Sequence, residues 1–154
     1  MAAGTRVRRI AGAGIGPWLD AVARLRIAVF RDWPYLYAGD FGYEQDYLRA
    51  YARSPDSVFV LAFDGDEVVG VSTGLPLADD TAEFQQPFLD AGRDVGEVFY
   101  FGESVLLPAY RGRGIGHRFE FRNLRVNASR SDTHTYDAGM REIVFNLFRK
   151  DFET

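Results

Sequence analysis

The sequence predicts an α/β domain in which helices flank a β-sheet. Two apolar, β-branched runs are separated by Asp64-Gly65-Asp66, a turn that is typical of β-hairpins. Before this hairpin, apolar residues recur at helical spacing in two segments, 18–30 and 43–53. After it, a strand at 97–107 runs directly into a glycine-rich turn and a helix start. Strands and helices are therefore interspersed along the chain, as they are in α/β folds.

The first expected elements are a strand and a helix joined by a flexible, glycine-rich turn. Residues 6–11 alternate weakly in polarity, which indicates a strand. The turn ends at Pro17, a residue that fits the first turn of a helix. Because apolar residues recur through the helix at 18–30, Arg24 and Arg26 are expected on its other faces.

The central part of the chain is expected to contain a helix, a hairpin, a further helix and a strand. The helix follows an aromatic loop and has aromatic and leucine side chains at helical spacing. The further helix stands between the third and fourth strands and ends before a glycine. The first helix is expected at 43–53, the two strands of the hairpin at 58–63 and 67–73, the further helix at 79–91 and the last strand at 97–107.

The C-terminal segment is short, because only 154 − 116 = 38 residues follow Gly116. We expect a helix at 115–128, a short fifth strand at 133–136 and a last helix at 138–150. At a rise of about 1.5 Å per helical residue, these elements leave no room for a closing hairpin. Because open sheet edges are usually paired or covered, we expect either a homodimer through this C-terminal edge or a mobile C-terminus.

Composition and charge indicate one globular domain over residues 1–154. The chain has 154 residues, 47% of them hydrophobic, which is ample material for one core. A net charge of −4 argues against nucleic acid or an anionic membrane as a general partner. There is no cysteine for a disulfide or a thiol nucleophile, and neither histidine suggests a metal site. With neither a signal peptide nor a membrane span expected, the predicted location is the cytoplasm.

The stretch from Glu103 to Gly116 carries the clearest chemical signal. Its apolar strand ends at Pro108, which cannot donate a ladder hydrogen bond. Three glycines and two arginines follow within six residues, just before the expected helix. A strand, a glycine turn and a helix N-terminus direct several backbone N–H groups to one point, which suits a phosphate or pyrophosphate. The spacing differs from the dinucleotide fingerprint and from the P-loop.

At these residues the chain resembles the GNAT family of acetyl-CoA-dependent N-acyltransferases. The family pattern is a strand ending in an apolar residue, often followed by proline, then Arg or Gln, two free positions, Gly, a free position, and Gly or Ala. The matching residues are Leu106, Pro108, Tyr110, Arg111, Gly112, Gly114, Ile115 and Gly116. The resemblance implies a mixed, centrally splayed sheet flanked by helices, here with its closing C-terminal hairpin missing.

The resemblance also implies an activity and a cosubstrate. A member of this family transfers an acetyl group from acetyl-CoA to a primary amine, which attacks the thioester directly in a ternary complex. A non-catalytic or truncated acyl-CoA-binding domain of the same fold is the alternative. The implied cofactor-binding residues are the pantetheine-contacting strand edge and the pyrophosphate loop: Ser104, Val105, Leu106, Arg111, Gly112, Arg113, Gly114, Ile115 and Gly116.

Glu103 is the candidate base that removes the amine proton. A carboxylate among aromatic residues has a raised pKa, which suits a base near neutral pH. A glutamate hydrogen-bonded for structure is the competing interpretation, and a bulge in the strand would change the face on which Glu103 lies. In the family a tyrosine often protonates the leaving thiolate, but Phe148 stands at that position here. Tyr136, Tyr110 or solvent is left for this role.

The acceptor amine cannot be identified from the sequence. Trp33, Tyr35 and Tyr37 are candidates for the wall of an acceptor pocket, because the family's first two helices flank that site. The same aromatic residues could instead form an ordinary core cluster. A small molecule and a protein amine are both open as partners.

Overall fold

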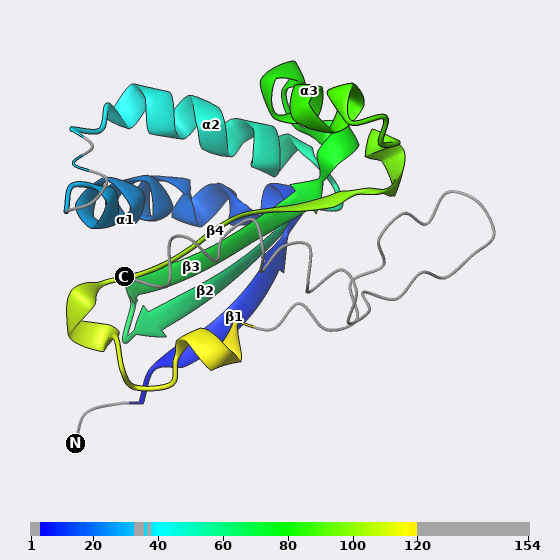
Figure 1. Cartoon of the computed structure of the whole chain (residues 1–154). Coiled ribbons are helices and arrows are strands. Elements are labelled where there is room, and N and C mark those ends of the chain that lie inside the picture. Colours follow the sequence, from blue (N-terminus) through cyan, green and yellow to red (C-terminus); the bar gives the residue numbers. More distant parts are fainter. Residues whose placement is uncertain (1–3, 33–35, 37, 120–154) are drawn as a thin grey trace.

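A computed structural model of the chain describes residues 4–32, 36 and 38–119. These residues form one antiparallel sheet with helices over one face (Figure 1). Several predictions fall outside this range and are not addressed by the structure. They concern the aromatic residues Trp33, Tyr35 and Tyr37, and the elements expected from residue 120 onward, including Tyr136, Phe148, the fifth strand and the C-terminal edge.

Four strands lie in the order β1-β2-β3-β4, and each pairs antiparallel with the next. Within the described residues β4 is therefore an edge strand. The strand expected at 133–136 lies outside the described residues. The strands are β1 Arg6–Ala11, β2 Val58–Asp64, β3 Glu67–Pro76 and β4 Phe99–Leu106.

The helices confirm the expected order, with small differences at their ends. After β1, a 3-10 helix at Gly12–Trp18 replaces the expected flexible turn and leads into α1, Leu19–Phe30. The second helix, α2, spans Phe41–Arg53 and begins two residues earlier than predicted. It starts there because Asp40 caps it by accepting a hydrogen bond from the Tyr43 backbone N–H at 2.9 Å.

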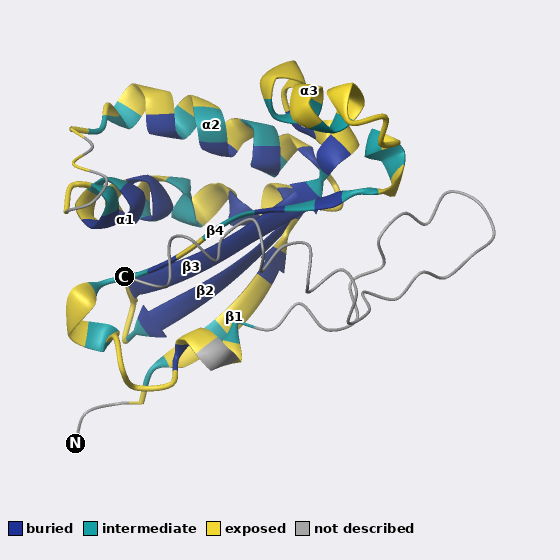
Figure 2. Ribbon diagram, in the orientation of Figure 1, coloured by how far each residue is buried: buried dark blue, intermediate teal, exposed yellow. Residues whose placement is uncertain are grey.

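The helix between the third and fourth strands, α3, spans Ala82–Asp90. It lies at one end of the sheet, above the junction between β3 and β4 (Figure 1). None of its residues is buried, so it is predominantly exposed in Figure 2, whereas β2 and β3 are buried along most of their length. Short 3-10 turns at Leu77–Asp79 and Val95–Glu97 connect it to the two strands.

The main core lies between the sheet and the pair α1 and α2. It contains apolar residues from both helices, such as Val22 and Leu48, and alternate residues of the central strands, such as Phe59 and Val71. The opposite face of the sheet carries a second apolar group around Phe99 and Phe101. This alternation is what two half-buried faces of a sheet require.

A β-bulge in β4 determines which side chains face the helices. Thr73 pairs with Glu103 and Gly74 pairs with Phe101, so Gly102 is an extra residue in β4. A Cβ on Gly102 would meet side chains of the helix face, while Phe101 lies on the opposite face. Beyond the bulge, Val105 returns to the main core, so Glu103 lies on the helix face as well. Strict alternation from Phe99 would have placed Glu103 on the other face.

Candidate functional site

The glycine-rich loop leaves β4 at Leu106 and forms an open turn. Gly112 and Gly114 both have φ of +74°, in the left-handed region that favours glycine. A Cβ at Gly112, Gly114 or Gly116 would meet nothing within 4 Å. No described residue accepts a hydrogen bond from the backbone N–H groups of residues 112–116. The turn therefore presents consecutive amide groups that no described residue uses as donors, as an anion site requires.

Contacts at both ends hold this turn against the sheet. The Tyr110 hydroxyl donates to Asp64 Oδ2 on the hairpin at 2.6 Å. Ile115 is buried and packs with Ala62 and Val69. Arg118 donates to the Thr5 carbonyl at 2.7 Å. The loop is thus anchored by side chains that flank the glycines, and the amide donors themselves are not used in the anchoring.

The two loop arginines are exposed but are not free. Arg111 Nε donates to the Leu106 carbonyl oxygen at 3.0 Å. The Arg113 guanidinium lies 5.2 Å from the ring centroid of Tyr110. Both cations stay beside the turn, where an anion held by the loop would meet positive charge.

The edge of β4 offers backbone groups in a fixed alternation. The Leu107 N–H donates to the Val69 carbonyl at 2.9 Å, so Leu107 and, by alternation, Val105 and Glu103 bond to β3. Ser104 and Leu106 then direct their N–H and C=O groups away from β3. The Leu106 carbonyl accepts from Arg111, which agrees with this direction. At the Ser72–Ser104 pair the two hydroxyl oxygens are 2.6 Å apart.

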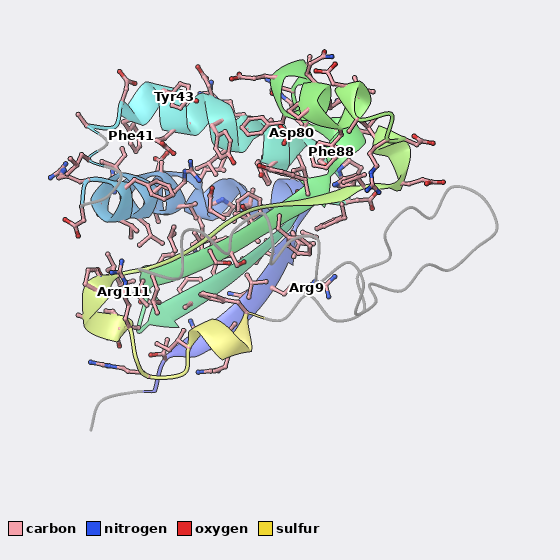
Figure 3. The ribbon with its side chains drawn as sticks, in the orientation of Figure 1. Arg9, Phe41, Tyr43, Asp80, Phe88 and Arg111 are labelled. Atoms are coloured by element: carbon pink, nitrogen blue, oxygen red, sulfur yellow. The ribbon has the colours of Figure 1, made fainter. Side chains whose placement is uncertain are left out.

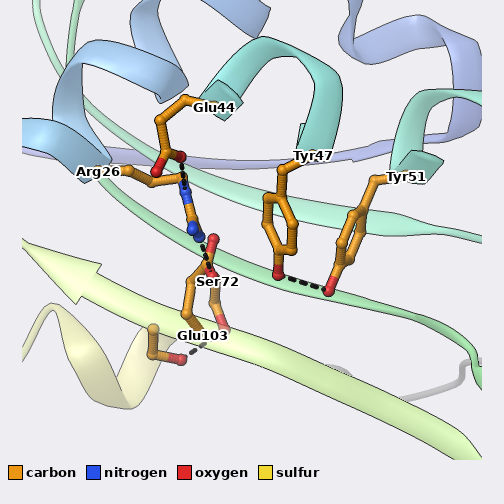
Figure 4. A network of polar contacts seen from close by, with 7 residues as sticks. Arg26, Glu44, Tyr47, Tyr51, Ser72 and Glu103 are labelled. Atoms are coloured by element: carbon orange, nitrogen blue, oxygen red, sulfur yellow. Dashed lines mark hydrogen bonds and ion pairs between the residues drawn. The ribbon is translucent and has the colours of Figure 1, made fainter. Parts of the chain in front are cut away.

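Glu103 takes part in a buried polar network between β4 and the two helices. The Arg26 guanidinium, from α1, forms ion pairs with Glu44 of α2 and with Glu103 of β4 (Figure 4). The guanidinium also lies over the Tyr47 ring, 4.4 Å from its centroid, and the Tyr47 and Tyr51 hydroxyl oxygens are 3.2 Å apart. Two carboxylates share one guanidinium, so the ionised group carries one excess negative charge.

The environment of Glu103 favours its protonated form more than water does. Burial raises the pKa of Glu103 above its ordinary value of 4.5, and the positive charge of Arg26 opposes this rise. About a tenth of the side chain remains exposed. Its Oε1 atom accepts no hydrogen bond from the described residues. The carboxylate therefore has an unused acceptor atom and a charge that proton uptake would neutralise.

Arg26 and Glu44 were not identified from the sequence as residues of the site. Arg24 is exposed as expected, but the expectation for Arg26 is wrong, because Arg26 is buried against its two carboxylate partners. Helical spacing places both residues on the buried faces of their helices. Arg26 follows the buried Val22 by four positions, and Glu44 precedes Leu48 by four on the buried stripe of α2. A charged residue at a core position implies a buried partner.

Among the other candidate residues, Tyr110 is at the loop rather than beside Glu103. Its hydroxyl donates to Asp64, and this hydrogen bond raises the pKa of Tyr110. The structure therefore brings together Glu103, the β4 edge and the glycine loop on one continuous segment. None of the described helices is long and apolar enough to cross a membrane.

A comparison of the sequence with protein-family models identifies the acetyltransferase (GNAT) family over residues 23–119, well over half of the chain. The chain belongs to this GNAT family. The matched region runs from α1 to the end of the described glycine loop, so it includes both the Arg26 network and the open turn. Among proteins of curated function, none is significantly similar to this chain.

A solved structure supports the same GNAT fold. It is an aminoglycoside N-acetyltransferase, AAC(6')-Iy, in complex with CoA, which superposes with a TM-score of 0.50 at 15% sequence identity. The superposition covers 75% of this chain and 63% of that protein, so the chain spans less than two thirds of its neighbour's length. At this identity the likeness concerns the fold. The predicted fold class, a GNAT-like sheet flanked by helices, is thereby confirmed.

The close packing around Gly102, the extra residue of the bulge, predicts that a larger residue there destabilises the fold. A Cβ at Gly102 would collide with the Tyr51 hydroxyl oxygen and would lie 2.7 Å from Thr73 Oγ1. Because Tyr51 is fully buried, we expect Gly102→Ala to lower the free energy of unfolding by about 1–3 kcal/mol. Urea denaturation gives this value. Tyr51→Phe removes the colliding oxygen, so it should restore part of the loss in the double variant.

The matched control is Gly16→Ala, because an added Cβ there meets nothing within 4 Å. This variant should be close to the unsubstituted protein in stability. Strictly additive effects of Gly102→Ala and Tyr51→Phe would contradict the proposed collision.

Proposed function

We propose that this GNAT-family protein is an N-acetyltransferase that moves the acetyl group of acetyl-CoA to a primary amine. The observation that carries the proposal is the arrangement along β4. An open turn lies at the C-terminal end of the strand, a backbone edge that no described strand pairs with precedes it, and the largely buried carboxylate of Glu103 stands just before that edge. The CoA bound to the structural neighbour supports the assignment of the cosubstrate.

In this proposal the loop and the strand edge bind the cosubstrate. The amides of residues 112–116 hold the pyrophosphate, with Arg111 and Arg113 beside it. The pantetheine lies along the edge at Ser104, Val105 and Leu106 and pairs with the outward groups of Ser104 and Leu106. One of the outward N–H groups polarises the acetyl carbonyl, an effect typically worth about 3–4 kcal/mol.

The amine attacks the carbonyl carbon of the thioester directly. A C–N bond forms, the C–S bond breaks, and the CoA thiolate leaves. The proton lost by the amine nitrogen passes to Glu103, either directly or through one water. Proton uptake leaves the group of Arg26, Glu44 and Glu103 electrically neutral, which favours this step in a buried site. We assign protonation of the thiolate to Tyr136 or to solvent.

Arg26 and Glu44 are positioning residues in this scheme. Arg26 holds Glu103 Oε2, and we assign the amine proton to Oε1, which is buried and has no hydrogen-bond partner among the described residues. Glu44 supplies the second negative charge, without which Arg26 and Glu103 would already be a neutral pair. The excess charge is what makes a carboxylate that is paired with arginine able to act as a base.

The first test of this function is cosubstrate binding. CoA and acetyl-CoA should raise the melting temperature, and at 100 times the dissociation constant the stabilisation is about 2.7 kcal/mol. NAD and ATP should have much smaller effects. Gly116→Val should abolish the CoA shift, because the added side chain fills the open space before the amides.

Gly116 is the informative position because its φ is not positive and an added Cβ meets nothing in the structure itself. Its substitution should therefore leave the melting temperature without ligand nearly unchanged. Equal shifts with CoA, NAD and ATP, or normal CoA binding by Gly116→Val, would rule out the loop as the pyrophosphate site. CoA binding without transfer to any amine would indicate the non-catalytic alternative.

A further inference from the structure

A further buried carboxylate, Asp80, lies outside the network of Arg26, Glu44 and Glu103, at the opposite end of the sheet from the glycine loop. Figure 3 shows Asp80 and Phe88 at the end of the sheet where α3 lies, and Arg111 at the other end. Asp80 is only 9% exposed. Its Oδ1 accepts from the Thr81 backbone N–H at 2.8 Å, but within the described residues its buried Oδ2 has no hydrogen-bond partner. A buried carboxylate oxygen without a donor requires an explanation.

Asp80 adjoins α3 through the hydrogen bond that its backbone carbonyl accepts from Gln85, and aromatic side chains of α2, α3 and β4 pack together there. Tyr47 from α2, Phe84 and Phe88 from α3, and Tyr100 from β4 form what we call the aromatic row. Ring centroids are 6.3 Å apart for Tyr47 and Phe84, 5.7 Å for Phe84 and Tyr100, and 6.4 Å for Phe88 and Tyr100. All four residues are only partly buried. Partly exposed aromatic faces beside a carboxylate are the usual surroundings of a bound ammonium group.

The charges of Glu103 and Asp80 both act on the two tyrosines of this row. Burial raises the pKa of Tyr47, and the negative charge of Glu103 raises it further. Burial also raises the pKa of Tyr100, and there the charge of Asp80 is the next cause. Burial raises the pKa of Asp80 itself, so a cation beside it would favour its ionised form.

We propose that Asp80 and the aromatic row bind a second cationic group of the acceptor, so that the preferred substrate is a diamine or polyamine. This inference rests on the proposed acetyl transfer. The neutral amine that reacts lies at Glu103, and the distal ammonium donates to Asp80 Oδ2 while its alkyl chain lies along the aromatic faces. The helix α3, which has no buried residue, covers this end and can move to admit the chain.

Arginine and lysine side chains of the protein do not already occupy this position in the described chain. The nearest cation of the network, Arg26, is paired with Glu44 and Glu103 and lies at the Tyr47 end of the row. Asp80 has no such cation in an ion pair with it among the described residues, so a substrate with a single amine at Glu103 would leave it unpaired.

The kinetic test compares each α,ω-diamine with the monoamine of the same carbon number, for example cadaverine with n-pentylamine, at saturating acetyl-CoA. We expect kcat/KM to be at least about tenfold higher for the diamine at the best chain length, since charged hydrogen bonds are strong in such sites. In Asp80→Asn this ratio should fall to near one. Asparagine keeps an Oδ1 acceptor for Thr81 and removes only the charge.

The matched control is Asp90→Asn, which removes the same charge from an exposed position on α3. Asparagine can still accept the hydrogen bond that Asp90 receives from Gln86. This variant should keep the full preference for the diamine. Acetylation of amines without a diamine preference, or with a preference that Asp80→Asn retains, would overturn the inference and leave the proposed function standing.

A binding measurement tests the site even if no amine is acetylated. Cadaverine is titrated calorimetrically into the full chain in the presence of CoA, with n-pentylamine as the comparison. We expect cadaverine to bind at least about tenfold more tightly to the unsubstituted protein, and this difference to disappear in Asp80→Asn. Equal binding of the two amines, or undiminished cadaverine binding by Asp80→Asn, would rule out the cation site. Selective binding without turnover would instead contradict the proposed function.

Discussion

Replacing Arg26 with methionine is expected to lower the free energy of unfolding by about 3–5 kcal/mol, because it leaves two buried carboxylates without their cation. Methionine keeps much of the apolar stem of Arg26 and removes the charged guanidinium, which lies over the Phe30 and Tyr47 rings. The loss is therefore electrostatic in origin and should depend on pH. Denaturant unfolding at several pH values measures it.

The direction of the pH dependence follows from Glu103. Its pKa in the folded protein is already raised by burial above the ordinary 4.5, and loss of Arg26 removes the charge that opposes this rise. The folded state then holds a proton that the unfolded chain releases, so the variant loses stability as pH rises and regains it as pH falls toward about 4.5. Arg24→Met, an exposed change on the same helix, is the control and should have little effect. A large loss that is the same from pH 5 to pH 8 would mean that packing, not charge, dominates.

Replacing Glu103 with glutamine is expected to lower kcat by about 10²–10⁴, the usual share of general acid–base catalysis. Glutamine retains the shape and can still accept a hydrogen bond from Arg26, but it cannot take the proton of the amine. The affinity for CoA should change little, since Glu103 bonds to β3 and to Arg26 and not to the outer edge of β4.

The pH–rate profile separates a base from a structural glutamate. If Glu103 is the base, the fall in kcat/KM toward low pH should disappear in Glu103→Gln. Glu97→Gln, at an exposed position before the same strand, should behave as the unsubstituted protein does. A profile that keeps its acidic limb at full rate in Glu103→Gln would move the role to another group.

The parts of the fold that local patterns determine were predicted well. The hairpin at Asp64-Gly65-Asp66 is correct because a turn of this kind limits the chain to few conformations. The first strand, residues 6–11, is confirmed to the residue. The glycine-rich turn follows β4 where the sequence predicted it, and Gly112 and Gly114 in it have left-handed backbone conformations.

The parts that depend on distant residues could not be predicted. The side of β4 on which Glu103 lies depends on an extra residue, Gly102, and only the register with β3 reveals it. The buried position of Arg26 depends on two carboxylates from other elements of the fold. Neither hydrophobic periodicity nor propensity contains that information, because both describe neighbours along the chain.

The exposed helix α3 has a consequence for how the protein opens. A segment held by no buried side chain has little free energy of its own opposing a sub-global opening, whereas the central strands open only with the whole domain. Its amides should therefore exchange with deuterium well before those of β2 and β3. The protein can then expose the end of the sheet that contains Asp80 while the core between the sheet and the other two helices stays intact.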